Sequence, residues 1–119
     1  MVTSIPKKHW QRLRPCVVDK TLSVGEPETS FSYPSGHATG GTVDALLLAE
    51  LFPEKKDAIL TFGRNLGWHR VLIAKHYPSD IYAGRVLGQA IVRELKANPA
   101  FQHDFEEAKA ELAAAGHAP

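Results

Sequence analysis

The sequence is poor in cysteine and has no excess of charge of one sign, and each shortage argues against a class of protein. A single cysteine, Cys16, excludes an internal disulfide and a zinc site of paired cysteines. We expect it to be a small buried side chain. The 14 Lys and Arg residues almost balance 13 Asp and Glu, which leaves a formal net charge of +1. Without a basic block, a nucleic-acid partner is not expected.

Long apolar runs are also missing. The longest apolar stretch, residues 45–52, is interrupted by Glu50 and is far shorter than the roughly 20 residues of a membrane span. The first 30 residues carry Lys and Arg without a following apolar region, so no secretory signal is predicted. A length of 119 residues predicts a single domain, residues 1–119.

Apolar residues recur at helical spacing, and no segment alternates like a strand. One helix is predicted over Thr42–Leu51 and a second from about 54 to 74. A third begins at Pro78 and should direct Leu87, Ile91 and Leu95 inward, and a fourth covers residues 101–115 with Gly116 as its stop. Residues 20–33, rich in Ser, Thr, Gly and Pro, are predicted to form an exposed loop. The expected class is an all-α helical bundle, with Trp10 and Trp68 in its core and Gly84 and Gly88 at a close helix contact.

Polar residues gather in three clusters. In the first, six residues separate Lys7 from Arg14, and Pro15 follows. The second is Pro34-Ser35-Gly36-His37, directly before an apolar helix. In the third, Arg70 is followed after five residues by His76 and after three more by Asp80. A helix N-terminus has unpaired N–H groups and about half a positive charge, so the turn at Ser35 could hold an anion.

Each cluster also has an ordinary interpretation. Basic residues before a proline are typical of a solvated helix end. Ser35 could simply cap the helix while Gly36 eases the turn. His76 and Asp80 could be a hydrogen-bonded pair near a helix start.

Taken together, the three clusters resemble the signature of the type 2 phosphatidic acid phosphatase and haloperoxidase superfamily, over Lys7 to about Leu95. The segments YPSGHATGGTVDALLLAELFPEKKDAI and HYPSDIYAGRVLGQAI look most like the bacterial class A non-specific acid phosphatases. The resemblance implies the all-α bundle of that superfamily, apparently shortened at its N-terminus, because the family has a further helical region before the lysine. Position 69 departs from the pattern, since His69 stands where the family usually has serine, and we give it at most a supporting role.

The resemblance also implies a phosphate site. Two arginines would supply planar forks and a lysine a point charge to the phosphate oxygens, and a hydroxyl and a backbone N–H at the helix start would complete the cradle. The implied substrate-binding residues are Lys7, Arg14, Ser35, Gly36 and Arg70.

The implied catalytic residues are His37, His76 and Asp80. By the family's mechanism, His76 attacks phosphorus as a neutral imidazole and forms a phosphohistidine, while Asp80 fixes its tautomer. His37 protonates the leaving alkoxide and then activates water. No metal or other cofactor is expected, and vanadate or phosphate could occupy the site.

The expected function is therefore that of a metal-independent acid phosphatase acting on small phosphomonoesters. The alternatives are a vanadate-dependent haloperoxidase-like enzyme and a non-catalytic helical binding module with a vestigial phosphate site. By resemblance the location is periplasmic, with the leader absent from this chain, or cytoplasmic if Met1 is the native start. A shortened front would leave the inner faces around Thr42–Leu51 and Gly84–Leu95 partly uncovered, so a homo-oligomer is expected.

Overall fold

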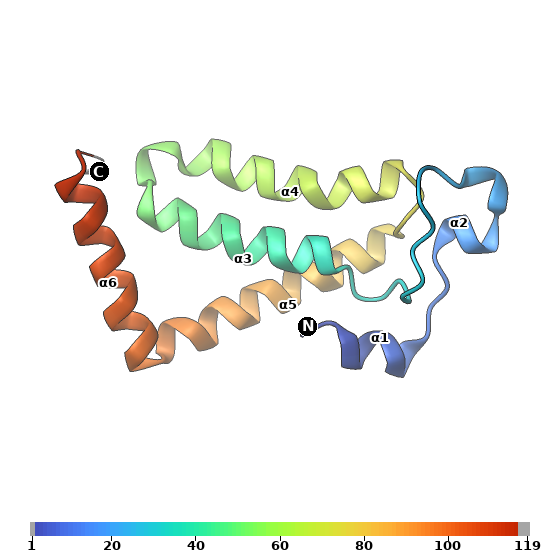
Figure 1. Cartoon of the computed structure of the whole chain (residues 1–119), viewed down its shortest axis with the longest axis horizontal. Helices are drawn as coiled ribbons and strands as arrows, with labels where there is room; N and C mark the ends of the chain where they lie inside the picture. Colours follow the sequence, from blue (N-terminus) through green and yellow to red (C-terminus); the bar gives the residue numbers. More distant parts are fainter. Residues whose placement is uncertain (1, 117–119) are drawn as a thin grey trace.

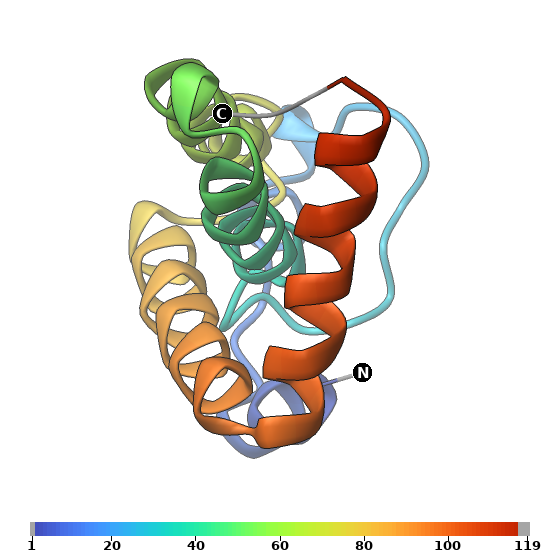
Figure 2. The same cartoon turned by 90° about the vertical axis from the view of Figure 1, so that its left-hand side faces the viewer.

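Three long helices form the body of the protein in a computed structural model that describes residues 2–116. They are α3 (Gly36–Leu51), α4 (Lys56–Leu72) and α5 (Pro78–Ala97), and α3 makes most of its contacts with the other two. Viewed from the end nearest α6, α3 lies between α4 and α5 (Figure 2). The N-terminus of α3, the C-terminus of α4 and the N-terminus of α5 therefore meet at one end of the bundle (Figure 1).

Shorter elements complete the two ends. The helices α1 (Ser4–Trp10) and α2 (Pro15–Val18) and the 3₁₀ turn η1 (Lys20–Leu22) lie at the end where α3 begins (Figure 1). At the other end, the 3₁₀ turn η2 (Pro53–Lys55) joins α3 to α4, and α6 (Pro99–Ala114) turns away from α5. No strand occurs over residues 2–116, and the predicted all-α class is confirmed.

Local sequence signals explain where the helices begin. The Ser35 hydroxyl accepts a hydrogen bond from the Ala38 backbone N–H at 3.1 Å, so α3 begins at Gly36 instead of the predicted Thr42. Pro78 and Pro99 occupy the first turns of α5 and α6, where a missing N–H costs nothing. The predicted breaks between the helices are confirmed.

Glycines bring α5 against the start of α3. A Cβ at Gly84 would lie 2.7 Å from the Ser35 carbonyl oxygen, and one at Gly88 would lie 2.9 Å from that of Thr39. The predicted packing role of Gly84 and Gly88 is confirmed. These close contacts set the second and third turns of α5 directly against the start of α3.

The buried apolar side chains are mostly small. They are Cys16, Ala38, Ala45, Ala49, Ile81 and Val92. Cys16 is buried as expected. The prediction that Leu87, Ile91 and Leu95 point inward is only partly right, because the glycine face of α5 packs on α3 and leaves these three residues half-buried.

The two tryptophans were wrongly predicted to lie in the core. Trp10 is 61% exposed and Trp68 is 47% exposed. The buried residues of α4 are Gly63, Gly67 and Arg70, and Trp68 lies beside this stripe instead of on it. Trp10 ends the short helix α1 and contacts the ring of Tyr33 edge-on, with the ring centres 6.0 Å apart.

Several large apolar side chains are exposed on the long helices. They are Leu48, Phe62, Leu66, Leu72, Tyr82 and Val86. Such surface is compatible with the expected homo-oligomer, which stays a prediction. Within residues 2–116, no helix combines the length and the apolar character that crossing a membrane requires.

Candidate active site

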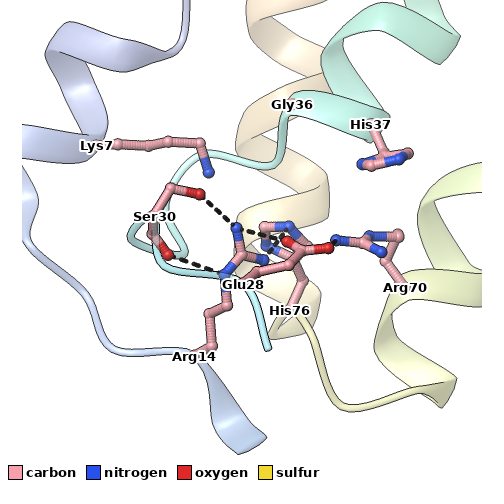
Figure 3. A pocket seen from close by; sticks show the side chains of 8 residues that line it. All are labelled: Lys7, Arg14, Glu28, Ser30, Gly36, His37, Arg70 and His76. Carbon is pink, nitrogen blue, oxygen red and sulfur yellow. Dashed lines mark hydrogen bonds and ion pairs between the residues drawn. The ribbon is translucent and has the colours of Figure 1, made fainter. Parts of the chain in front are cut away.

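A pocket of about 250 Å³ lies at the end of the bundle where α3 and α5 begin and α4 ends (Figure 3). Six of the eight predicted site residues line it, and they come from all three sequence clusters: Lys7, Arg14, Gly36, His37, Arg70 and His76. Glu28 and Ser30 complete the lining. The fold therefore brings together residues that are far apart in the sequence.

His76 lies just before α5 and is only 2% exposed. Its Nδ1 is 3.2 Å from Asp80 Oδ2, and its Nε2 is 3.0 Å from Nη1 of Arg14. A guanidinium can only donate, so Nε2 accepts and Nδ1 carries the proton that is donated to Asp80. Burial lowers the pKa of His76, and although Asp80 raises it, the net shift is downward and favours the neutral ring.

Asp80 is fully buried in the first turn of α5. Its Oδ2 accepts from His76, from the Ser32 hydroxyl and from the Tyr77 backbone N–H at 2.8 Å. Its Oδ1 accepts from Arg12 Nη1 at 3.0 Å. Burial alone would raise the pKa of Asp80, but the hydrogen bonds and the Arg12 charge outweigh it and keep the pKa below its ordinary value. The site thus contains a rigid, ionised carboxylate behind the imidazole.

The Arg14 guanidinium is 3% exposed and is held from several sides. Its Nε donates to the Ser30 carbonyl at 2.9 Å, and its Nη1 donates to the Lys75 carbonyl at 3.0 Å. Its Nη2 donates to the Ser30 hydroxyl and pairs with Glu28 Oε2, each at 2.9 Å. These contacts fix the position of Arg14 beside His76 (Figure 3).

Arg70, near the end of α4, pairs through Nη2 with Oε1 of Glu28 at 2.5 Å. Its buried Nε has no hydrogen-bond partner among the described residues. Burial would raise the pKa of Glu28, but the bond from Arg70 and the charges of Arg14 and Lys75 lower it overall. Glu28 is therefore an ionised carboxylate that bridges the two arginines.

Lys7 approaches the pocket from α1, opposite His37 and Arg70 (Figure 3). Its Nζ donates to the Phe31 carbonyl at 2.7 Å. Burial first, and the nearby Arg14 charge second, lower the pKa of Lys7 to about 8. The ammonium is therefore charged at neutral pH and loses its charge in mildly alkaline solution.

The first turn of α3 forms another wall, with Gly36 and His37 lining the pocket. His37 is exposed and makes no hydrogen bond within the described part of the chain. Burial and the charge of Arg70 lower its pKa. Ser35 is fully buried as the cap of α3 and does not line the pocket, so its phosphate contact stays a prediction. His69 is exposed and lies outside the lining.

Sequence reasoning missed the contribution of residues 20–33, which were predicted to be an exposed loop. Residues 20–27 are exposed as expected, but Glu28 and Ser30 line the pocket and Ser32 is fully buried against Asp80. No spacing signal marks these residues. Charge balance is a signal that could have identified Glu28. A cluster of cations around one pocket attracts a negative group, and Glu28 is an acidic residue in the segment between the first two clusters.

These groups are suited to a tetrahedral oxyanion. Two guanidinium groups, one ammonium and the N-terminus of α3 surround the pocket, and all of them favour negative charge. His76 lines the same pocket, and its unprotonated Nε2 accepts from Arg14 Nη1 and can act as a nucleophile once that hydrogen bond is released. His37 supplies a second imidazole that can carry a proton. The arrangement can hold a phosphoryl group and offer it both a nucleophile and an acid.

Comparison with known proteins agrees with this geometry. The chain is 36% identical over 118 residues to a non-specific acid phosphatase of Providencia stuartii, a match that covers 95% of this chain and 48% of that protein. It is 35% identical over 111 residues to an acid phosphatase of Zymomonas mobilis, covering 89% and 42% of the two chains. A shorter match, 44% identical over 59 residues, is to a lipid A 1-phosphatase of Rhizobium etli and covers 48% and 25%.

The chain spans about half the length of the acid phosphatases it matches. The family model described as the PAP2 superfamily matches residues 1–102, which include all three clusters and every residue that lines the pocket. With this match and the similarity to acid phosphatases over most of its length, the chain belongs to the PAP2 superfamily.

Proposed function

We propose that this protein hydrolyses small phosphate monoesters as an acid phosphatase, without a metal ion, through a phosphohistidine intermediate. The observation that carries the proposal is the buried His76–Asp80 pair, whose geometry puts the ring proton on Nδ1 and leaves Nε2 of His76 unprotonated at the pocket, where it accepts from Arg14. The similarity to non-specific acid phosphatases supports the same chemistry.

In the first step, Nε2 of His76 gives up its hydrogen bond from Arg14 Nη1, which then donates to the phosphate, and attacks phosphorus in line with the ester oxygen. The N–P bond forms, the P–O ester bond breaks, and the leaving oxygen takes a proton from protonated His37. In the second step, water attacks the phosphohistidine and gives a proton back to His37. The N–P bond breaks, inorganic phosphate leaves, and both histidines return to their starting states.

The remaining groups stabilise charge. The transferred phosphoryl group spreads negative charge over three equatorial oxygens, which Arg14, Arg70, Lys7 and the N-terminus of α3 are positioned to meet. Asp80 stabilises the positive charge that develops on the His76 ring and prevents its rotation. Hydrogen bonds to the Ser30 and Lys75 carbonyls and to the Ser30 hydroxyl hold the Arg14 guanidinium in place, so this group itself need not move when substrate binds.

The mechanism requires His76 neutral and His37 protonated at the same pH. Burial lowers the pKa of both, and His76 is much the more deeply buried of the two. Protonated His37 is therefore populated on the acid side of neutrality while His76 stays neutral. We expect a bell-shaped pH profile with an acid optimum.

The proposal is tested by hydrolysis of p-nitrophenyl phosphate in the presence of EDTA. The wild type should turn over at the same rate with and without the chelator, and His76→Ala should lose on the order of a thousandfold or more in kcat. His103→Ala, which removes an exposed imidazole on α6, is the matched control and should keep the full rate. Near-normal turnover by His76→Ala, or activity that EDTA removes and Zn²⁺ or Mg²⁺ restores, would overturn the mechanism.

A further inference from the structure

The anion that bridges the two arginines comes from the protein itself. Oε1 of Glu28 lies 2.5 Å from Nη2 of Arg70, and Oε2 lies 2.9 Å from Nη2 of Arg14. The carboxylate is placed between the two guanidinium groups inside the pocket (Figure 3). This is the position in which the proposed function requires phosphate oxygens.

The Glu28 carboxylate pairs with only part of the Arg70 guanidinium. Only Nη2 of Arg70 pairs with Glu28, and the buried Nε donor has no partner among the described residues. Leaving a buried charged donor unpaired is costly. A phosphate presents three terminal oxygens, so it can take the place of both carboxylate oxygens and also accept from Nε. The guanidinium pair therefore has more to gain from a phosphate than from Glu28.

The backbone on either side of Glu28 is anchored independently of its carboxylate. Lys75 Nζ donates to the Glu26 carbonyl at 2.8 Å, and Arg14 Nε donates to the Ser30 carbonyl at 2.9 Å. The Glu28 side chain is 31% exposed, so it borders solvent. Rotation of this one side chain can clear the pocket while the loop stays attached.

We propose that Glu28 is an internal ligand of the phosphate site, which the substrate phosphate must displace and which thereby determines the anions that the site admits. The inference rests on the proposed function, because it takes the pocket to be a phosphate site. While Glu28 is paired the site is closed to ligand, so the apparent dissociation constant is the intrinsic one divided by the unpaired fraction. Small carboxylates are excluded, because a free carboxylate can make only the contacts with the two arginines that Glu28 already makes. Glu28 has the advantage of a high effective concentration, since it belongs to the same chain.

Three variants distinguish the effect of the Glu28 bridge on phosphate binding from the effect of its negative charge. Glu28→Gln removes both, and Glu28→Asp keeps the charge on a side chain that is one methylene shorter and cannot span both arginines. Glu26→Gln removes a charge from the same loop but keeps the bridge, because Glu26 takes part in this region through its backbone carbonyl, which accepts from Lys75 Nζ. The probe is inorganic phosphate, titrated into each variant of the 119-residue chain by calorimetry at pH 6, and urea unfolding verifies that each variant is folded.

The expected result is that Glu28→Gln binds phosphate about tenfold more tightly than the wild type, which corresponds to an unpaired fraction of about one tenth. Glu28→Asp should gain in the same direction, and Glu26→Gln should stay within about twofold of the wild type. Unchanged or weaker phosphate binding by Glu28→Gln would overturn the inference and leave the proposed function intact. Equal gains in phosphate affinity in Glu28→Gln and Glu26→Gln, with none in Glu28→Asp, would show that Glu28 acts only through its negative charge and not as a bridge, and would overturn the inference. Absence of phosphate binding in every protein would contradict the proposed function and the inference together.

Discussion

Replacing Gly84 by alanine should weaken both the bundle and the pocket. The new Cβ would lie 2.7 Å from the Ser35 carbonyl oxygen, 2.8 Å from the Ala38 Cβ and 3.1 Å from the Thr39 backbone nitrogen. Two of these three atoms belong to the backbone of the Ser35 cap and of α3, and they cannot rotate away. The helices must therefore separate by some tenths of an ångström, at the point where the Ser35 backbone N–H donates to the Asp80 carbonyl at 3.1 Å.

The size of the effect follows from two opposing contributions. Overpacking a close contact typically costs about 1–3 kcal/mol, whereas alanine is favoured over glycine inside a helix by up to about 1 kcal/mol. We expect a net loss of about 1–2 kcal/mol in the free energy of unfolding, and a Tm lower by about 4–8 °C for a domain of this size. The rate should fall further than stability alone requires, because a shift of Gly36 and His37 misplaces groups that line the pocket.

The assay is urea unfolding of the variant alongside Gly40→Ala, with turnover measured on the same samples. Gly40 is an exposed position in the same α3 helix, and a Cβ there would meet nothing within 4 Å. Gly40→Ala should therefore be as stable as the wild type or more stable by up to about 1 kcal/mol. If Gly84→Ala were as stable and as active as Gly40→Ala, the close approach of α5 to α3 would be refuted.

Three further predictions concern protonation. Lys7 has a pKa of about 8, so phosphate affinity should fall as the pH rises through 8 in the wild type, whereas in Lys7→Arg, which keeps its charge, calorimetry should show no such fall. The folded-state pKa of His76 is lowered from 6.5, so its contribution to stability is complete above pH 6.5 and is lost as the pH falls toward the folded value. Urea midpoints should therefore drop between pH 7 and pH 5 in the wild type and drop less in His76→Gln; equal drops would show that other groups control the transition. His37→Ala should slow alkyl phosphates at least tenfold more than p-nitrophenyl phosphate, because a poor leaving group needs the acid most, and equal losses would remove His37 from that role.

Sequence patterns were sufficient for the helices that have strong local signals. Pro78 and Pro99 mark helix starts whatever the rest of the chain does, so the breaks before α5 and α6 could be predicted. The start of α3 was predicted at Thr42, because the apolar pattern begins there, although the Ser35 cap begins the helix at Gly36. The burial of individual side chains could not be predicted from these patterns. The inner faces of α4 and α5 are lined by glycines, so the helices meet backbone to backbone, and Trp68 and Leu87 lie beside the contact instead of within it.

For the site, the resemblance of the three clusters to the superfamily signature identified six of the residues that line the pocket. The other residues of the site could be identified only from the tertiary structure. Glu28 is recognisable only once Arg14 and Arg70 are known to face the same space, because its neighbours in the sequence carry no periodic signal. Arg12 and Ser32, which hold Asp80, were missed for the same reason.

The most direct test of the account is to trap the phosphoryl group on the protein. His37→Ala should still form the adduct with p-nitrophenyl phosphate but hydrolyse it slowly, so the adduct should accumulate within the first turnovers. After an alkaline quench and trypsin digestion, cleavage after Lys75 and Arg85 releases residues 76–85, in which His76 is the only histidine. We predict one acid-labile phosphoryl group on this peptide, located at His76 by mass spectrometry. Turnover by His37→Ala without such an adduct, or with the phosphoryl group on any other side chain, would contradict the assignment of His76 as the nucleophile.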